Sequence, residues 1–106
     1  MPVPRAAIVQ ELRKAEQAHQ LLGEVERRLA GENTGVEELL SQLEQLERSL
    51  PEDDSIRLLI ESAVGSARTR SSMKAGSEVA RSRSVIGGEI SRLRGTIEGI
   101  DSRADL

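Results

Sequence analysis

This chain of 106 residues is rich in Ser, Asp and Glu, but it has few of the residues that bind transition metals. There is one histidine, His19, and there is no cysteine and no aromatic residue. Without cysteine the chain cannot form a disulfide, an iron–sulfur cluster or a thiolate zinc site. His19 lies on a helical pattern between Ala15 and Leu22, a position typical of a structural histidine. We therefore expect no bound metal and no catalytic role for this residue.

Other residues with catalytic potential have simpler interpretations. The carboxylate pairs Glu37–Glu38 and Asp53–Asp54 stand where helical patterns begin, and acidic side chains there cap a helix and interact with its dipole. The glycine pair at 87–88 follows no strand and lacks the spacing of a phosphate-binding loop. The chain also contains no Gly-x-Ser-x-Gly sequence, which would mark a nucleophile. We expect a protein that is not an enzyme and has no cofactor.

A basic, serine-rich segment at 68–83 is the one candidate for binding phosphate backbones. Its cations are Arg68, Arg70, Lys74, Arg81 and Arg83. The whole chain carries a net charge of −3, which divides into −6 over residues 1–62 and +3 over 63–106. The alternative is therefore a solvated helix face that pairs with the acidic N-terminal half. Because no aromatic residue lies between the arginines, binding of nucleic acid or of an anionic surface is the lesser alternative.

The composition indicates a single helical domain over residues 1–106. Leu, Ile and Val make up 27 of the 106 residues, about 25%, which exceeds the roughly 20% below which chains are disordered. An aliphatic core without aromatics suits thin helix–helix contacts, so we expect an elongated molecule. No apolar run approaches the roughly 18 residues of a membrane span, and no secretion signal is visible. We expect a soluble protein, cytoplasmic by default or exported without a cleaved signal.

Residues 5–30 form the first predicted helix. Apolar residues recur there at intervals of three and four, which is the period of an amphipathic helix. They are Ile8, Leu12, Ala15, Ala18, Leu22, Val25 and Leu29. The glycines at 31 and 35 end this pattern.

Residues 35–50 form the second predicted helix. Thr34 and Glu37 have the spacing of a capping box, in which each side chain satisfies a backbone N–H group. A heptad stripe follows, widened by Leu40 and ended by Pro51. The stripe consists of Val36, Leu39, Leu43, Leu46 and Leu50.

Residues 54–101 are predicted as a third helix that begins at an N-cap formed by residues 53–55. A continuous helix is favoured, and the alternative is a break at the weak point 74–77, where Gly76 precedes Ser77. A second heptad stripe follows, and residues 102–106 are expected to fray. This stripe consists of Ile86, Ile90, Leu93, Ile97 and Ile100.

A row of small residues runs beside the second heptad stripe. It consists of Ser84, Gly88, Ser91, Gly95, Gly99 and Ser102. Small residues let two helix backbones approach closely, so Gly95 and Gly99 could belong to a dimer or partner face. The alternative is that the glycines only loosen this helix.

The sequence predicts an all-α, elongated protein, either an antiparallel helical hairpin or a three-helix bundle with coiled-coil-like contacts. We expect a non-enzymatic interaction protein (an adaptor, chaperone or assembly partner) that pairs with itself or another protein. For the stripes themselves, packing mainly within the chain is the favoured use, and both uses can hold because a thin bundle leaves apolar surface for a partner. The predicted partner-binding residues are Leu39, Leu43, Leu46, Leu50, Ile86, Ile90, Leu93, Gly95, Ile97, Gly99 and Ile100.

The chain also resembles the small helical-hairpin proteins of type VII (ESX-like) secretion. The likeness is strongest over the Ser/Ala/Gly-rich stretch SEVARSRSVIGGEISRLRGTIEGID. It implies a secreted protein or secretion partner that works as a homodimer or heterodimer. The chain departs from the family at its candidate turn, residues 31–35, which lacks the Trp-x-Gly motif. It also lacks the tyrosine of the export signal, so no functional residue is carried over from the family.

Overall fold

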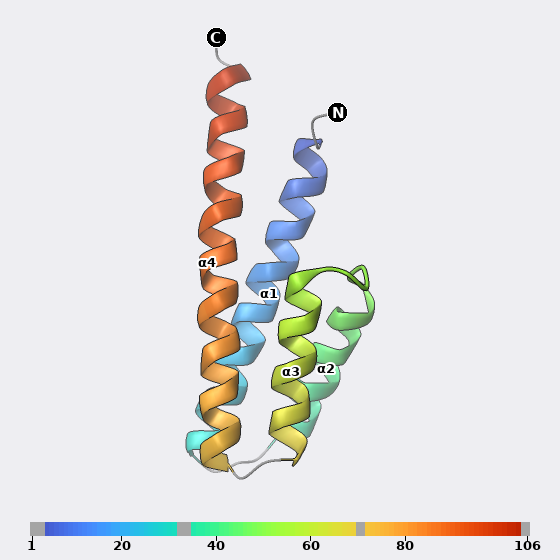
Figure 1. The fold of residues 1–106 in the computed structure, drawn as a ribbon, viewed down its shortest axis with the longest axis vertical. Helices are drawn as coiled ribbons and strands as arrows, with labels where there is room; N and C mark the ends of the chain where they lie inside the picture. Colours follow the sequence, from blue (N-terminus) through green and yellow to red (C-terminus); the bar gives the residue numbers. More distant parts are fainter. Residues whose placement is uncertain (1–3, 32–34, 70–71, 105–106) are drawn as a thin grey trace.

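The structure, a computed structural model, describes residues 4–31, 35–69 and 72–104 and shows a bundle of helices (Figure 1). In these ranges there are four helices and no strand, which confirms the predicted all-α class. The helices are α1 (Arg5–Ala30), α2 (Val36–Arg48), α3 (Ser55–Thr69) and α4 (Ser72–Ala104). Consecutive helices run in opposite directions, and α1 packs mainly against α4 while α2 packs against α1 and α3.

The four helices differ greatly in length, and this difference gives the molecule its shape. The 26 residues of α1 and the 33 of α4 span about 39 and 50 Å, whereas α2 and α3 span only about 20 and 22 Å. The α2–α3 turn lies beside Lys14, whose Nζ donates a hydrogen bond to the Ser49 carbonyl over 2.9 Å. Beyond this turn α1 and α4 continue as a two-helix hairpin (Figure 1). We call residues 5–14 and 95–104 the projecting end. The whole molecule measures 53 × 23 × 18 Å.

The apolar stripes of all four helices meet in one core. Leu22, Leu43, Ile60 and Ile86 are completely buried in it. Burial of each such side chain contributes about 1.5–3 kcal/mol. The stripe predicted for the first helix is confirmed: five of its residues are buried, and Leu12 and Leu29 pack against the core at its edge.

The bounds of α1 agree with the predicted helix over 5–30. Pro4 precedes the helix in an extended conformation, where its missing N–H group costs nothing. At the other end the N–H of Gly31 donates to the carbonyl of Arg27 over 3.1 Å. The cations Arg27 and Arg28 stand in the last turn, where they complement the helix dipole.

The second helix is shorter than the predicted range 35–50. It is preceded by Gly35, which has a φ of 71°, a left-handed conformation that glycine adopts readily. Thr34 of the predicted capping box lies outside the described residues, and Glu37 accepts a hydrogen bond from Arg68. The helix ends at Arg48, before Pro51, and the Ser49 hydroxyl donates to the carbonyl of Leu46.

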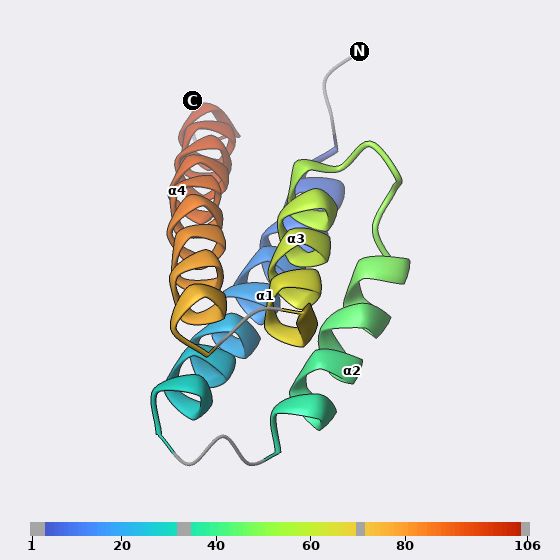
Figure 2. The same ribbon diagram turned by 60° about the horizontal axis from the view of Figure 1, so that its bottom comes forward.

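The structure differs from the continuous helix favoured over 54–101 and agrees with the alternative of a broken one, although the break precedes 74–77. The chain forms two helices there, α3 and α4, which lie side by side in opposite directions (Figure 2). The predicted weak point at 74–77 lies inside α4. A continuous helix of about 70 Å would carry Ile56 and Ile60 away from the core, whereas the reversal buries both. The N-cap at the start is confirmed, because Asp54 Oδ1 accepts the N–H of Ile56 over 2.8 Å.

The predicted fraying of 102–106 also differs from the structure. Residues up to Ala104 are helical, and 105–106 lie outside the described residues. Two contacts accompany this extension of α4. Arg5 pairs with Asp101, and the Nε of Arg103 donates to the carbonyl of Gly99 over 3.3 Å.

Candidate functional site

The middle predicted stripe is used inside the bundle. Leu43, Leu46 and Leu50 are buried, and Leu40, predicted only to widen the stripe, is buried as well. Leu39 packs against the core but stays half-buried. The chain's own helices therefore cover this stripe, in agreement with the packing within the chain that the sequence favoured.

The C-terminal stripe divides into two parts along α4. Ile86, Ile90 and Leu93 are buried in the core of the bundle. Ile97 and Ile100 lie in the projecting end, where they pack against the core cluster but remain half-buried. The aliphatic surface that holds the bundle together thus continues into a region that α2 and α3 do not cover (Figure 1).

The row of small residues lies on the outer side of α4. Gly88 and Gly95 are exposed, and a Cβ atom at either position would meet no other atom within 4 Å. At Gly99 a Cβ atom would be 3.8 Å from Nη2 of Arg103. In the described part of the chain this face of α4 makes no close approach to another helix backbone.

Three ion pairs join α1 to α4 along the hairpin. They are Arg5–Asp101, Glu16–Arg94 and Glu26–Arg83, with N···O distances of 2.8, 2.9 and 2.8 Å. Their positions along both helices define one antiparallel register. The opposite charges of the two halves indicated pairing between them, but not which residues pair.

Part of the basic segment pairs with the acidic half of the chain. Arg68 forms ion pairs with Glu37 and Glu44 of α2, and Arg83 pairs with Glu26 of α1. Hydrogen bonds to Glu37 and then Glu44 raise the pKa of Arg68 above its usual value, so the guanidinium stays charged. Lys74 and Arg81 are exposed, whereas Arg70 lies outside the described residues. For Arg68 and Arg83 the structural interpretation of the segment is confirmed.

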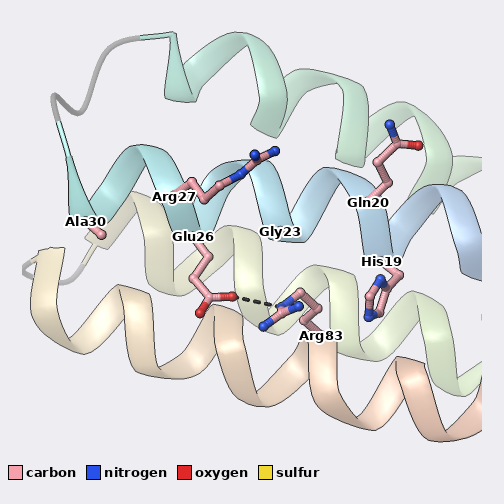
Figure 3. A pocket seen from close by; sticks show the side chains of 7 residues that line it. All are labelled: His19, Gln20, Gly23, Glu26, Arg27, Ala30 and Arg83. Carbon is pink, nitrogen blue, oxygen red and sulfur yellow. Dashed lines mark ion pairs between the residues drawn. The ribbon is translucent and has the colours of Figure 1, made fainter.

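A shallow groove runs between α1 and α4 on the outer side of the hairpin (Figure 3). One hollow of about 420 Å³ adjoins a second of about 350 Å³, and His19 and Gln20 line both. We call these two hollows together the α1–α4 groove. The first is also lined by Gly23, Glu26, Arg27, Ala30 and Arg83, and the second by Glu16, Gly87, Ile90, Ser91 and Arg94. His19, which was predicted to be a structural residue, thus lines both hollows.

No group of three or more His, Cys, Asp or Glu residues that could hold a metal ion occurs in the ranges 4–31, 35–69 and 72–104. Over the same residues, none of the helices combines the length and the apolar character needed to cross a bilayer.

Comparisons of the chain with protein-family models, with curated proteins and with solved structures found no match. The resemblance to type VII secretion proteins accordingly stays a prediction.

Proposed function

We propose that this protein is a non-enzymatic helical interaction protein that pairs with a second copy of itself through the projecting end. One observation carries the proposal: the aliphatic surface shared by α1 and α4 extends past the end of its cover. Leu12, Ile97 and Ile100 lie on this extension and keep part of their surface exposed. Burial of exposed aliphatic surface is the main favourable contribution in most protein association.

The bundle itself supports a helix pair as the occupant of this surface. At the opposite end of the hairpin, the antiparallel pair α2 and α3 covers the same aliphatic stripe of α1 and α4 (Figure 2). The projecting end is also an antiparallel pair of helices. Two projecting ends related by a twofold axis can therefore form a four-helix arrangement between two copies.

The charges of the projecting end support a second copy over a strongly charged partner. The ionic side chains of this region nearly cancel, which leaves a net charge of only +1 and little repulsion between two such ends. They are Arg5, Arg13, Lys14 and Arg103 against Glu11, Glu98 and Asp101.

Size-exclusion chromatography with light scattering tests the proposal. Refractive-index detection is needed because the chain has no Trp or Tyr. The unmodified protein is expected to elute as a concentration-dependent dimer, and Ile100→Glu is expected to make it a monomer with unchanged helical circular dichroism. Leu58→Glu is the matched control, since Leu58 on α3 is 56% exposed and lies outside the projecting end. This variant should remain a dimer.

Three results would contradict the proposal. The unmodified protein could be a fully helical monomer at all concentrations, or Ile100→Glu could leave the dimer intact. In the third, Gly95→Leu but not Ile100→Glu abolishes the dimer, which would move the contact to the outer face of α4. A monomer that forms a one-to-one complex with a different helical protein would replace self-pairing by a heterodimer.

A further inference from the structure

We propose that the α2–α3 turn, residues 49–54, is a docking surface for the second copy of this chain. The two projecting ends then overlap antiparallel, and the tip of each, the end at which both chain termini lie, rests against the turn of the other (Figure 1). This inference rests on the dimer proposed above. It adds a surface outside the projecting end and fixes the relative direction of the two copies.

A notch at the corner between α1 and this turn marks the docking surface. It has a volume of about 280 Å³, and its lining includes Ala7 and Lys14 of α1 and Leu50 and Pro51 of the turn. Lys14 donates a hydrogen bond to the carbonyl of Ser49, so this face of α1 turns toward the side on which α2 packs. The notch therefore lies where α2 and α3 stop covering α1.

The bulk of α2 and α3 allows only one direction of overlap. Both helices pack on the side of the hairpin to which the stripe of α4 belongs, and this stripe continues through Ile97 and Ile100 (Figure 2). If two copies faced each other in parallel, their α2–α3 pairs would collide before the projecting ends met. An antiparallel twofold arrangement keeps the two pairs apart and lets the uncovered surfaces meet.

The lengths of the elements bring each tip to a turn. Residues 5–14 of α1 and 95–104 of α4 each extend about 15 Å beyond the covered part of the hairpin. When two such ends overlap fully, the tip of one copy reaches the α2–α3 turn of the other. Neither copy then keeps a free projecting end, so assembly stops at two copies.

The ends that meet are electrostatically complementary. In an antiparallel twofold arrangement α4 lies over α4 of the other copy, in line with α3, which also packs beside α4. The carbonyl end of α4 therefore faces the N–H end of α3, and the two helix dipoles attract. Glu52 and Asp53 of the turn and Arg103 near the tip are exposed and form no ion pair within the described residues. Docking places these opposite charges side by side.

Small-angle X-ray scattering of the dimer measures the direction of overlap. Two copies 53 Å long that overlap by about 15 Å form a particle about 90 Å long. A parallel or fully side-by-side dimer is little longer than one copy. We expect a maximum dimension near 90 Å, and a value below about 70 Å at a concentration at which light scattering shows a dimer would overturn the inference.

Ala7→Glu and Ala6→Glu form a matched pair of variants. They place the same charge on neighbouring exposed residues of α1, but only Ala7 lines the notch, together with Glu11 and Asp54. We expect Ala7→Glu to raise the dissociation constant of the dimer by about tenfold or more, because docking buries the new carboxylate beside two others. Ala6→Glu should leave the constant within about twofold. Equal effects of the two variants contradict docking at the notch.

Circular dichroism checks that both variants keep their helices. If Ala7→Glu lowers the helicity, Gln10→Glu takes its place, since Gln10 also is exposed and lines the notch.

Chemical crosslinking tests the contact between tip and turn. The chain contains no cysteine, so introduced cysteines report one contact at a time. Copies with Glu52→Cys are mixed with copies with Arg103→Cys, treated with a short bismaleimide and analysed by mass spectrometry. A crosslink between positions 52 and 103 is expected. Ser84→Cys replaces Arg103→Cys in the control, because Ser84 is exposed on α4 outside the projecting end. Equal yields in the two mixtures refute the contact.

The failure of this inference differs from the failure of the dimer itself. A monomeric unmodified protein overturns both proposals. If Ile100→Glu dissociates the dimer while Ala7→Glu does not and the particle is short, the projecting ends still pair. The α2–α3 turn is then not their docking surface.

Discussion

At the scale of single residues, the strongest sequence-based prediction concerns the start of α3. Asp54 accepts the N–H of Ile56, whereas Asp53 beside it is exposed. Asp54→Ala is therefore expected to lower the free energy of unfolding by about 1 kcal/mol, and Asp53→Ala should change it by less than about 0.5 kcal/mol. Urea unfolding followed by circular dichroism measures both. Equal losses in the two variants would show that the carboxylates act through their charge alone.

The glycines allow a second prediction at this scale. Gly88 and Gly95 are exposed inside α4 with open space around them, whereas Gly35 has a φ of 71°. Alanine at 88 or 95 should raise the free energy of unfolding by about 0.5–1 kcal/mol, because glycine costs more backbone entropy in a helix. Alanine at Gly35 should lower it, since a side chain is strained there.

Thermal unfolding of the three alanine variants shows whether the signs differ in this way. Because dimerisation also raises the midpoint, the comparison is made at a protein concentration at which all variants are monomers. Destabilisation by Gly95→Ala in the monomer would contradict the open environment found for this residue.

At the scale of the helices, the ion pairs between α1 and α4 determine how the two helices are aligned, and they contribute little to the free energy of unfolding. Both side chains of the Glu16–Arg94 pair are more than 40% exposed. Solvent screening keeps such pairs to about 0.2–1 kcal/mol, and added salt weakens them further. The burial of Ile86 and Ile90 contributes more to the joining of the two helices.

A double-mutant cycle tests this weak coupling. Glu16→Gln and Arg94→Gln are expected to show a coupling free energy below about 1 kcal/mol that decreases as salt is added. A cycle of Glu16→Gln with Arg81→Gln is the control, and it should be additive because Arg81 makes no ion pair with Glu16. A coupling free energy of several kcal/mol that does not change with salt would contradict the prediction. It would show that the Glu16–Arg94 pair is much less solvated than the exposed fractions of its side chains indicate.

At the scale of the whole molecule, the unequal helix lengths leave the projecting end of α1 and α4 with fewer neighbouring helices than the rest of the bundle. Ala15, Ala18, Leu22 and Val25 of α1 are buried in the core of the bundle, whereas the projecting end consists of two helices without a third neighbour (Figure 1). Segments with few buried contacts open at lower free energy than the core. Residues 98–104 are therefore expected to be the least protected part of α4 in the monomer.

Hydrogen exchange at two protein concentrations measures this difference. In dilute protein the amides of 98–104 should exchange faster than those of 79–93. At concentrations at which dimers form, protection should rise in the projecting end, while α2 shows no comparable gain. Uniform amide protection along α4 in the monomer would contradict the expectation that the projecting end opens more easily than the core.

The sequence by itself determined the helical class, the bounds of α1 and the cap of α3. These features are local: a repeat of three and four residues, a proline or glycine at an end, and one carboxylate two residues from its N–H partner. The same local pattern continues across residues 54–101, so it favoured one helix where the chain forms two. The stripes of α2 and α4 were also visible, but not whether the chain or a partner would cover them.

Only the tertiary structure decided which of these surfaces are covered. The reversal between α3 and α4 follows from the burial of Ile56 and Ile60, a gain that exists only when four helices meet. The pairs Glu16–Arg94 and Arg5–Asp101 join residues 78 and 96 positions apart, a separation that no local pattern reports. His19 looked structural in sequence and became part of a groove because Gly87 of α4 lies against it. Contacts between distant residues depend on how helices fold back on one another, and the hydrophobic core sets that arrangement.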